Sequence, residues 1–256
     1  MNWLILHPRV LFVVSLVLMW SATRLGVALS AWRDKGDEVA GDRYGLIVGA
    51  TLTLTGLIVG FSFSMSVGRY DQRKNLEAGE ANAIGTEYVR ADLLADPAAA
   101  AKARTLLKAY LERRILFYTS RDDSQLREVD VRTAQLQKQL WEVTRAAGAA
   151  QPTPVVALAV SGMNDVLNSQ GYAQAAWWNT IPSEAWLLMM LIALCGNALV
   201  GAGTRDAKAE RRLSLVLPLM TALSFFLIAD IDSPRNGVIR VTPQNLQSLA
   251  DSFRAP

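Results

Sequence analysis

The chain has 256 residues, of which 51% are hydrophobic and 19% charged, and its mean hydropathy is +0.19. This apolar content exceeds that of an ordinary soluble domain, so a membrane protein is favoured. The 26 basic and 23 acidic residues give a net charge of +3 without a block of Lys and Arg, so nucleic acid is not an expected partner. One cysteine and one histidine can form neither an intrachain disulfide nor a Cys/His metal cluster.

The apolar residues gather in four charge-poor runs of about 20 residues, each long enough to cross a hydrocarbon core as a helix. The first two runs occupy residues 10–32 and 45–68. The second contains no charge and is followed at once by aromatic and basic residues, which is typical of a membrane interface. A secretory signal peptide is the alternative for the first run, although the segment before it has little positive charge.

The region between the second and third runs, residues 69–182, contains no further span. Its Ala-rich segments, with Leu and Tyr at three- and four-residue spacing, predict three to five helices outside the membrane. The second spanning helix is expected to continue beyond the membrane until Asp96-Pro97. The helices expected after it cover residues 102–118, 125–147 and 155–168.

The third and fourth runs occupy residues 183–203 and 213–231, and spanning helices tolerate the Pro218 of the fourth run. The sequence therefore predicts an all-α integral membrane protein with four transmembrane helices. The predicted regions are two spanning helices in residues 1–68, a helical extramembrane region at 69–182, two spanning helices in 183–231 and a C-terminal tail at 232–256.

The second run has two distinct faces when it is projected at about 100° per residue. One face is a stripe of small residues that predicts a closely packed neighbour, the alternative being that glycine is ordinary filler in a spanning helix. Its members are Gly45, Gly49, Gly56 and Gly60.

The other face, roughly opposite, is a line of hydroxyl groups that ends in cations. Such a line suits a helix that borders a water-filled path, or one that forms interhelical hydrogen bonds inside a solid bundle. Its members are Thr51, Thr55, Ser62, Ser66, Arg69 and Arg73.

Two sets of acidic residues are candidates for a chemical site. Asp230 and Asp232 could contribute oxygen ligands to a cation, although interfacial capping or solvation also explains them. Glu77, Glu80 and Glu87 are interpreted as a salt-bridged, solvated helix face. No phosphate loop, nucleophile elbow or His-Glu metal motif occurs, so neither an enzyme nor a cofactor is expected.

Three stretches of the chain resemble the bestrophin-like domain family of uncharacterised bacterial membrane proteins. They are Gly60-Phe-Ser-Phe-Ser-Met-Ser-Val-Gly-Arg-Tyr-Asp-Gln-Arg-Lys74, Glu80-Ala-Asn-Ala-Ile-Gly-Thr-Glu-Tyr88 and Asp230-Ile-Asp-Ser-Pro-Arg-Asn-Gly-Val-Ile-Arg-Val241. Together with the four similarly spaced spans, the resemblance covers most of the chain.

The more remote similarity to true bestrophins implies a pentameric ion channel whose second helix lines the pore and whose second-to-third connection is cytoplasmic. It adds Val59 to the pore candidates Thr55, Ser62 and Ser66. It also implies that Asp230 and Asp232 correspond to an acidic segment that helps bind calcium, although this chain has no long acidic run there.

These expectations lead to one hypothesis and one alternative. The hypothesis is an oligomeric ion channel or channel-like pore, with the lipid bilayer, ions and further copies of the chain as partners. The alternative is a membrane-anchored interaction, scaffold or sensory protein without transport activity. The resemblance implies a bacterial inner membrane, with both termini and residues 69–182 in the cytoplasm, whereas the nearly balanced loop charges slightly favour the outside for that region.

Overall fold

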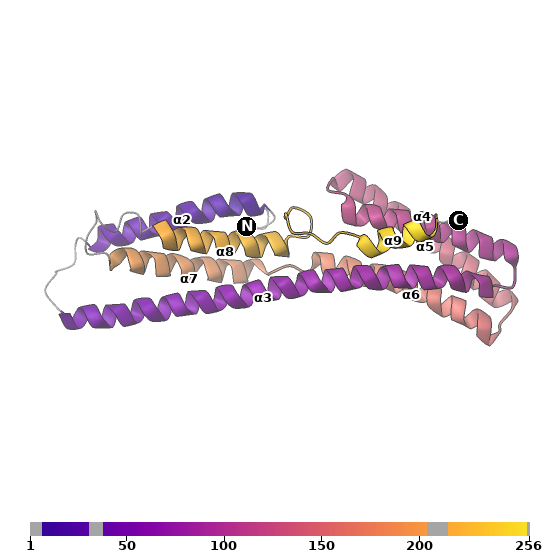
Figure 1. Ribbon diagram of the computed structural model, residues 1–256, viewed down its shortest axis with the longest axis horizontal. Coiled ribbons are helices and arrows are strands. Elements are labelled where there is room, and N and C mark those ends of the chain that lie inside the picture. The colour runs from indigo at the N-terminus through magenta and orange to yellow at the C-terminus, as the bar shows by residue number, and fades with distance from the viewer. Residues whose placement is uncertain (1–6, 31–37, 204–214, 255–256) are drawn as a thin grey trace. The chain divides into compact units, whose positions relative to one another are not determined.

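The computed structural model describes residues 7–30, 38–203 and 215–254, and every regular element in them is a helix (Figure 1). This confirms the all-α prediction for the described part of the chain. The predicted span limits at Trp32 and Leu213 lie outside the described residues. In chain order the elements are α2 (Pro8–Ser30), α3 (Glu38–Arg90), the 3-10 helix η1 (Ala91–Leu93), α4 (Pro97–Thr119), α5 (Asp123–Ala150), α6 (Pro154–Trp178), α7 (Ser183–Ala202), α8 (Val216–Asp232) and α9 (Gln244–Ser252).

Three stretches of the described residues are long and apolar enough to cross a membrane, namely Pro8–Leu29, Arg43–Leu93 and Pro154–Ala202. They contain the whole of the second predicted run and most of the first and third. The predicted count of four is not confirmed, because the described part of α8 has 17 residues. A helix of that length extends about 26 Å, which is shorter than a hydrocarbon core of about 30 Å.

The chain divides into two compact units, which are considered separately. Unit 1 comprises residues 1–70 and 180–240, and unit 2 comprises residues 71–179 and 241–256. Helix α3 contributes residues to both units. Its 53 residues form one helix because the only breakers within it are glycines, which weaken a helix but do not end it as proline does.

In unit 1, α2 packs along α7 and α8 around a core of large apolar side chains. Two glycines set the closeness of the α2–α7 contact. A Cβ atom on Gly26 would overlap the backbone of Ala198, and one on Gly201 would overlap the backbone of Thr23. Small residues at such positions let spanning helices approach in lipid. The core residues include Leu11, Met19, Trp186, Met189 and Phe225.

In unit 2, α4, α5 and α6 pack in sequence order, and each begins with a side-chain cap. Asp96, Asp122 and Thr153 accept hydrogen bonds from backbone N–H groups two or three residues on. Such caps satisfy donors that the first turn of a helix leaves unpaired. Pro97 and Pro154 occupy first helical positions, where the missing N–H costs nothing.

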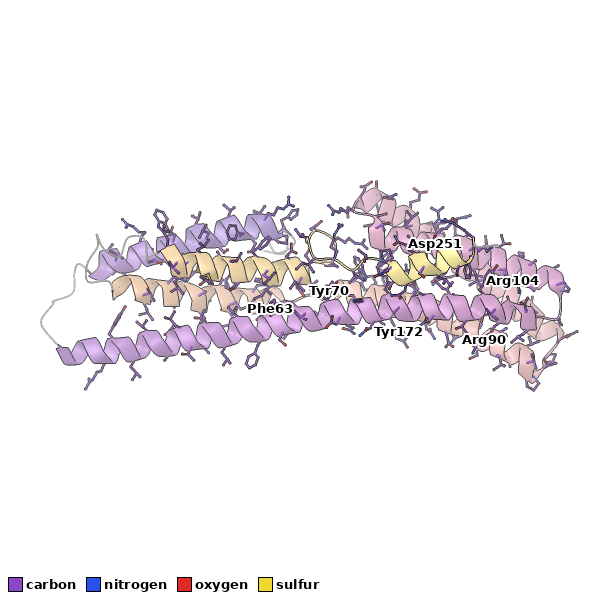
Figure 2. The ribbon with its side chains drawn as sticks, in the orientation of Figure 1. Phe63, Tyr70, Arg90, Arg104, Tyr172 and Asp251 are labelled. Atoms are coloured by element: carbon purple, nitrogen blue, oxygen red, sulfur yellow. The ribbon has the colours of Figure 1, made fainter. Side chains whose placement is uncertain are left out.

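The C-terminal helix α9 belongs to unit 2 and is held there at both ends. Leu249 fits beside Gly85, where a Cβ atom would come within 3.0 Å of it. The Phe253 ring stacks on Tyr88, with centroids 4.0 Å apart. Arg104, which is labelled in Figure 2, lies over the same tyrosine ring and pairs with Asp92.

Candidate functional site

The hydroxyl face of α3 lies inside unit 1. Thr51, Thr55 and Ser62 are half-buried, and Ser66 is fully buried. A Cβ atom on Gly196 of α7 would lie 3.5 Å from the Thr55 hydroxyl and 3.7 Å from the Thr51 methyl group, so α7 is the neighbour of this face.

Three of the four hydroxyl groups of this face donate hydrogen bonds within their own helix. Thr51 donates to the carbonyl of Ile47 at 2.8 Å, Thr55 to the carbonyl of Thr51 at 2.8 Å, and Ser66 to the carbonyl of Ser62 at 3.0 Å. This back-bonding lets a hydroxyl sit in an apolar environment without a distant partner. The face is therefore polar in composition, but these hydroxyl groups need no hydrogen-bond partner from another helix.

The glycine face of α3 meets nothing in the described part of the chain. A Cβ atom on Gly45, Gly49, Gly56 or Gly60 would have no atom within 4 Å. Any close neighbour of this face would therefore come from outside the described residues. Between the helices of unit 1, the glycines in close backbone contact are instead Gly26 and Gly201.

A third surface of α3, which we call the outward face, lies next to the glycine face on the exposed side of the helix. At about 100° per residue its centre is roughly opposite the hydroxyl face. Leu57 is 53% exposed there, and Val59 on the other side packs against the core of unit 1. Phe63, labelled in Figure 2, also belongs to the exposed half of the helix. The outward face comprises Leu46, Ala50, Thr53, Leu57 and Ser64, all exposed.

Arg69 and Arg73, predicted to end the hydroxyl face, form polar ties. In unit 1, Arg69 lies 3.1 Å from Asp232, whose other carboxylate oxygen accepts the N–H of Ile181 at 2.8 Å. In unit 2, the buried Arg73 donates to the carbonyl of Ala176 at 3.0 Å and to that of Asn179 at 2.9 Å. Those carbonyls lie at the C-terminal end of α6, where a cation is favourable.

Asp230 and Asp232 are engaged by hydrogen-bond donors. The two oxygens of Asp230 accept the N–H groups of Val238 and Ile239, each at 2.8 Å. Residues 7–30, 38–203 and 215–254 contain no group of three or more His, Cys, Asp or Glu that could hold a metal ion. The predicted cation site at the two aspartates gains no support, and we do not propose one.

Glu77, Glu80 and Glu87 of α3 are buried, so their interpretation as a solvated face is wrong. Glu77 accepts the N–H of Leu246 at 2.9 Å and the side-chain amide of Asn245 at 2.6 Å, which anchors the start of α9. On the helical projection these glutamates continue the hydroxyl face. That continuity was the available signal for burial.

Glu80 forms a fully buried ion pair with Arg114 and also accepts the hydroxyl of Tyr118 at 3.2 Å. Burial tends to lower the pKa of Arg114, but the adjacent Glu80 outweighs it, and the net shift is upward. Burial and then the negative charge of Glu80 raise the pKa of Tyr118. Both groups therefore keep their protons at any physiological pH.

Glu87 differs from the other two because one of its oxygens has no hydrogen-bond donor in the described residues. The residue is 2% exposed, and burial raises its pKa to about 8 even though Arg90 acts in the opposite direction. A Cβ atom on Gly162 would overlap this oxygen, so only glycine leaves room for the carboxyl group on α6.

Comparison with known proteins identifies the family and the fold. The model of the bestrophin-like domain matches residues 9–246. A bestrophin homologue from Klebsiella pneumoniae shares 14% identity over 94% of this chain and 99% of its own, with a TM-score of 0.62. A second variant of that homologue shares 16% identity over 94% and 96% of the two chains, with a TM-score of 0.64.

A solved membrane protein gives a similar result, with 13% identity, coverage of 93% and 98%, and a TM-score of 0.66. No curated protein matches. At these identities the structures establish a shared fold, whereas the domain match covers most of the sequence. The chain belongs to the bestrophin-like family.

Proposed function

We propose that the protein is a bestrophin-like oligomeric ion channel or channel-like pore of a bacterial inner membrane, with α3 lining a path shared by several copies. Family membership over residues 9–246 supports a channel-like role. The proposal includes a membrane crossing by α8, which would place both termini on one side, and a cytoplasmic location for unit 2.

The observation that most strongly supports a pore-lining role for α3 is how little of its apolar part the other described residues bury. No residue of the most apolar 18-residue window of Arg43–Leu93 is buried, whereas a third of the corresponding window is buried in Pro8–Leu29 and in Pro154–Ala202. A spanning helix with this little cover is positioned to contact further copies or an aqueous path, and its glycine-rich surface would let a neighbouring helix approach closely.

Two faces of α3 compete for the path. The sequence predicts the face with Thr51, Thr55, Val59, Ser62 and Ser66. In the single chain this face meets α7, and side chains that pack on α7 cannot border a shared axis at the same time. The exposure of α3 therefore favours the outward face, in which Thr53 and Leu57 would alternate hydroxyl and apolar surface along the path.

The proposal is tested by measuring mass and ion flux on the same preparation. Multi-angle light scattering of the purified protein in detergent should give several times the 28.0 kDa of one chain, and reconstituted liposomes should leak ions. A monomer would contradict the proposal, because the helices of one chain leave no room for a path. An oligomer without flux for any common ion would favour a membrane-anchored interaction protein.

A further inference from the structure

The loop after α8, residues 233–240, is folded back onto the helix that precedes it. Figure 1 shows the chain curling directly after α8. The two oxygens of Asp230 accept the N–H groups of Val238 and Ile239 at 2.8 Å, and the Ser233 N–H donates to the Ala229 carbonyl at 2.9 Å. Gly237 lies so close to the Asp230 carbonyl that a Cβ atom would overlap it.

This clamp presents two β-branched apolar side chains to the outside. Val238 is 66% exposed and Ile239 is 39% exposed, whereas Ser233 and Gly237 are buried. The backbone donors of both exposed residues are paired with Asp230, so the tip of the loop can enter a medium of low polarity without leaving these N–H groups unsatisfied.

The place of the loop in unit 1 indicates what the tip meets. Because Asp230 belongs to the last turn of α8, Val238 and Ile239 lie at the level where the apolar surface of α8 ends. If α8 crosses the membrane, as proposed above, that level is the boundary between acyl chains and headgroups. Exposed valine and isoleucine are stable at that depth and unfavourable in bulk water.

The charges beside the tip match a phospholipid surface. Arg235 and Arg240 flank the two apolar residues, and both are half-buried. Because neither arginine is fully buried, a headgroup phosphate can supply the opposite charge to the accessible part of each.

We propose that residues 235–240 form a lipid-binding tip, in which Val238 and Ile239 insert into the headgroup boundary and Arg235 and Arg240 contact anionic phospholipid. Asp230 is the positioning residue that holds the tip. The proposal rests on the crossing of α8, and its test includes a control that separates the two.

The test uses single cysteines in a Cys195→Ala background, each labelled with an environment-sensitive fluorophore. The labelled variants are Val238→Cys, Leu223→Cys as a lipid-facing control from the exposed surface of α8, and Ser124→Cys as a water-facing control. The proteins are reconstituted in vesicles of phosphatidylcholine and phosphatidylglycerol. Nitroxide-labelled phospholipid quenches a fluorophore at the boundary, and iodide quenches one in water.

The proposal predicts that nitroxide lipid quenches position 238 at least half as strongly as position 223, with no effect at position 124. Quenching at 223 without quenching at 238 would overturn the tip and leave the crossing of α8 intact, whether iodide reaches 238 or a second copy covers it. Absence of lipid quenching at both positions would overturn the tip together with the membrane topology.

A second variant tests the clamp. Asp230→Asn replaces one accepting oxygen by a donor, so one of the two N–H groups loses its partner. Lipid quenching at position 238 should fall by at least half in this background, while quenching at position 223 stays constant. Unchanged quenching at 238 would overturn the positioning role of Asp230.

Discussion

The two parts of α3 differ in how their inward-facing polar side chains are hydrogen-bonded. In unit 1, the buried face holds neutral hydroxyls that bond to carbonyls of their own helix. In unit 2, the continuing face holds ionisable residues, and Arg73, Glu77 and Glu80 each bind groups distant in sequence. Self-satisfied hydroxyls suit a helix surrounded by lipid, whereas paired charges specify which elements pack together.

The largest expected effect comes from breaking the buried ion pair of unit 2. Glu80→Ala leaves the Arg114 guanidinium buried without its counter-charge, so the free energy of unfolding should fall by about 3–5 kcal/mol. Lys138→Ala is the control, because that residue forms an exposed pair with Glu142 and should cost less than about 1 kcal/mol. Thermal unfolding in detergent measures both, and equal losses would contradict the account.

The next effect concerns the glycines of unit 1. Gly26→Val forces α2 away from α7, because the new side chain overlaps the Ala198 backbone, and a loss of about 2–3 kcal/mol is expected. Gly49→Val is the matched control, since open space surrounds Gly49 in the single chain. If the control leaves the melting temperature unchanged but reduces the mass in light scattering, the glycine face contacts another copy. A larger thermal loss for Gly49→Val than for Gly26→Val would refute the packing described for unit 1.

A smaller effect depends on pH and isolates Glu87. Its pKa rises from 4.5 to about 8 on folding, so between these values the folded protein retains a proton that the unfolded chain has released. The contribution of Glu87 to stability is therefore full below pH 4.5 and is lost as pH rises toward 8. Relative to Glu87→Gln, the native protein should lose about 2 kcal/mol between pH 5 and pH 8, less than the roughly 3.5 kcal/mol that a shift of this size would give without solvent screening.

Melting temperatures of the two proteins at pH 5, 6.5 and 8 provide the measurement for Glu87. The difference between them should widen with pH, whereas Glu112→Gln, at an exposed position of α4, should follow the native protein at every pH. Parallel curves for Glu87→Gln and the native protein would show that the Glu87 carboxyl group is solvated.

The smallest effect is expected on the hydroxyl face. Thr55→Val removes a hydroxyl that bonds only to the carbonyl of Thr51 one turn back, so the change in unfolding free energy should stay below about 0.5 kcal/mol. Thermal unfolding again provides the measurement. A loss above about 2 kcal/mol would mean that Thr55 bonds outside its own helix and that the contrast between the two parts of α3 is false.

The sequence was sufficient to predict the helices, because helix formation depends largely on local signals. The apolar runs and the Asp96-Pro97 break predict helices and a helix boundary that the structure contains, and α3 continues without interruption because it contains no proline. The faces of α3 also follow from its period. A period shows which residues share a face, but it does not show what meets that face.

The partners of those faces required tertiary structure. The burial of Glu80 depends on Arg114, which lies 34 residues away, and the role of Gly201 depends on a backbone segment of α2. The carboxylate of Asp230 suggested a cation ligand from its chemistry alone. Its actual donors, the N–H groups of Val238 and Ile239, are backbone atoms that every residue except proline provides, so their position could not be deduced from side chains.

The most direct test of the central claim, that α3 lines a shared ion path, is a cysteine scan of residues 48–73 in a Cys195→Ala background reconstituted in liposomes. A charged, membrane-impermeant thiol reagent should block ion flux at Thr53→Cys and Leu57→Cys on the outward face and leave Thr55→Cys and Ser62→Cys unaffected. Block at the hydroxyl face instead would restore the sequence prediction for that face. Flux that no position on α3 can block would contradict the claim.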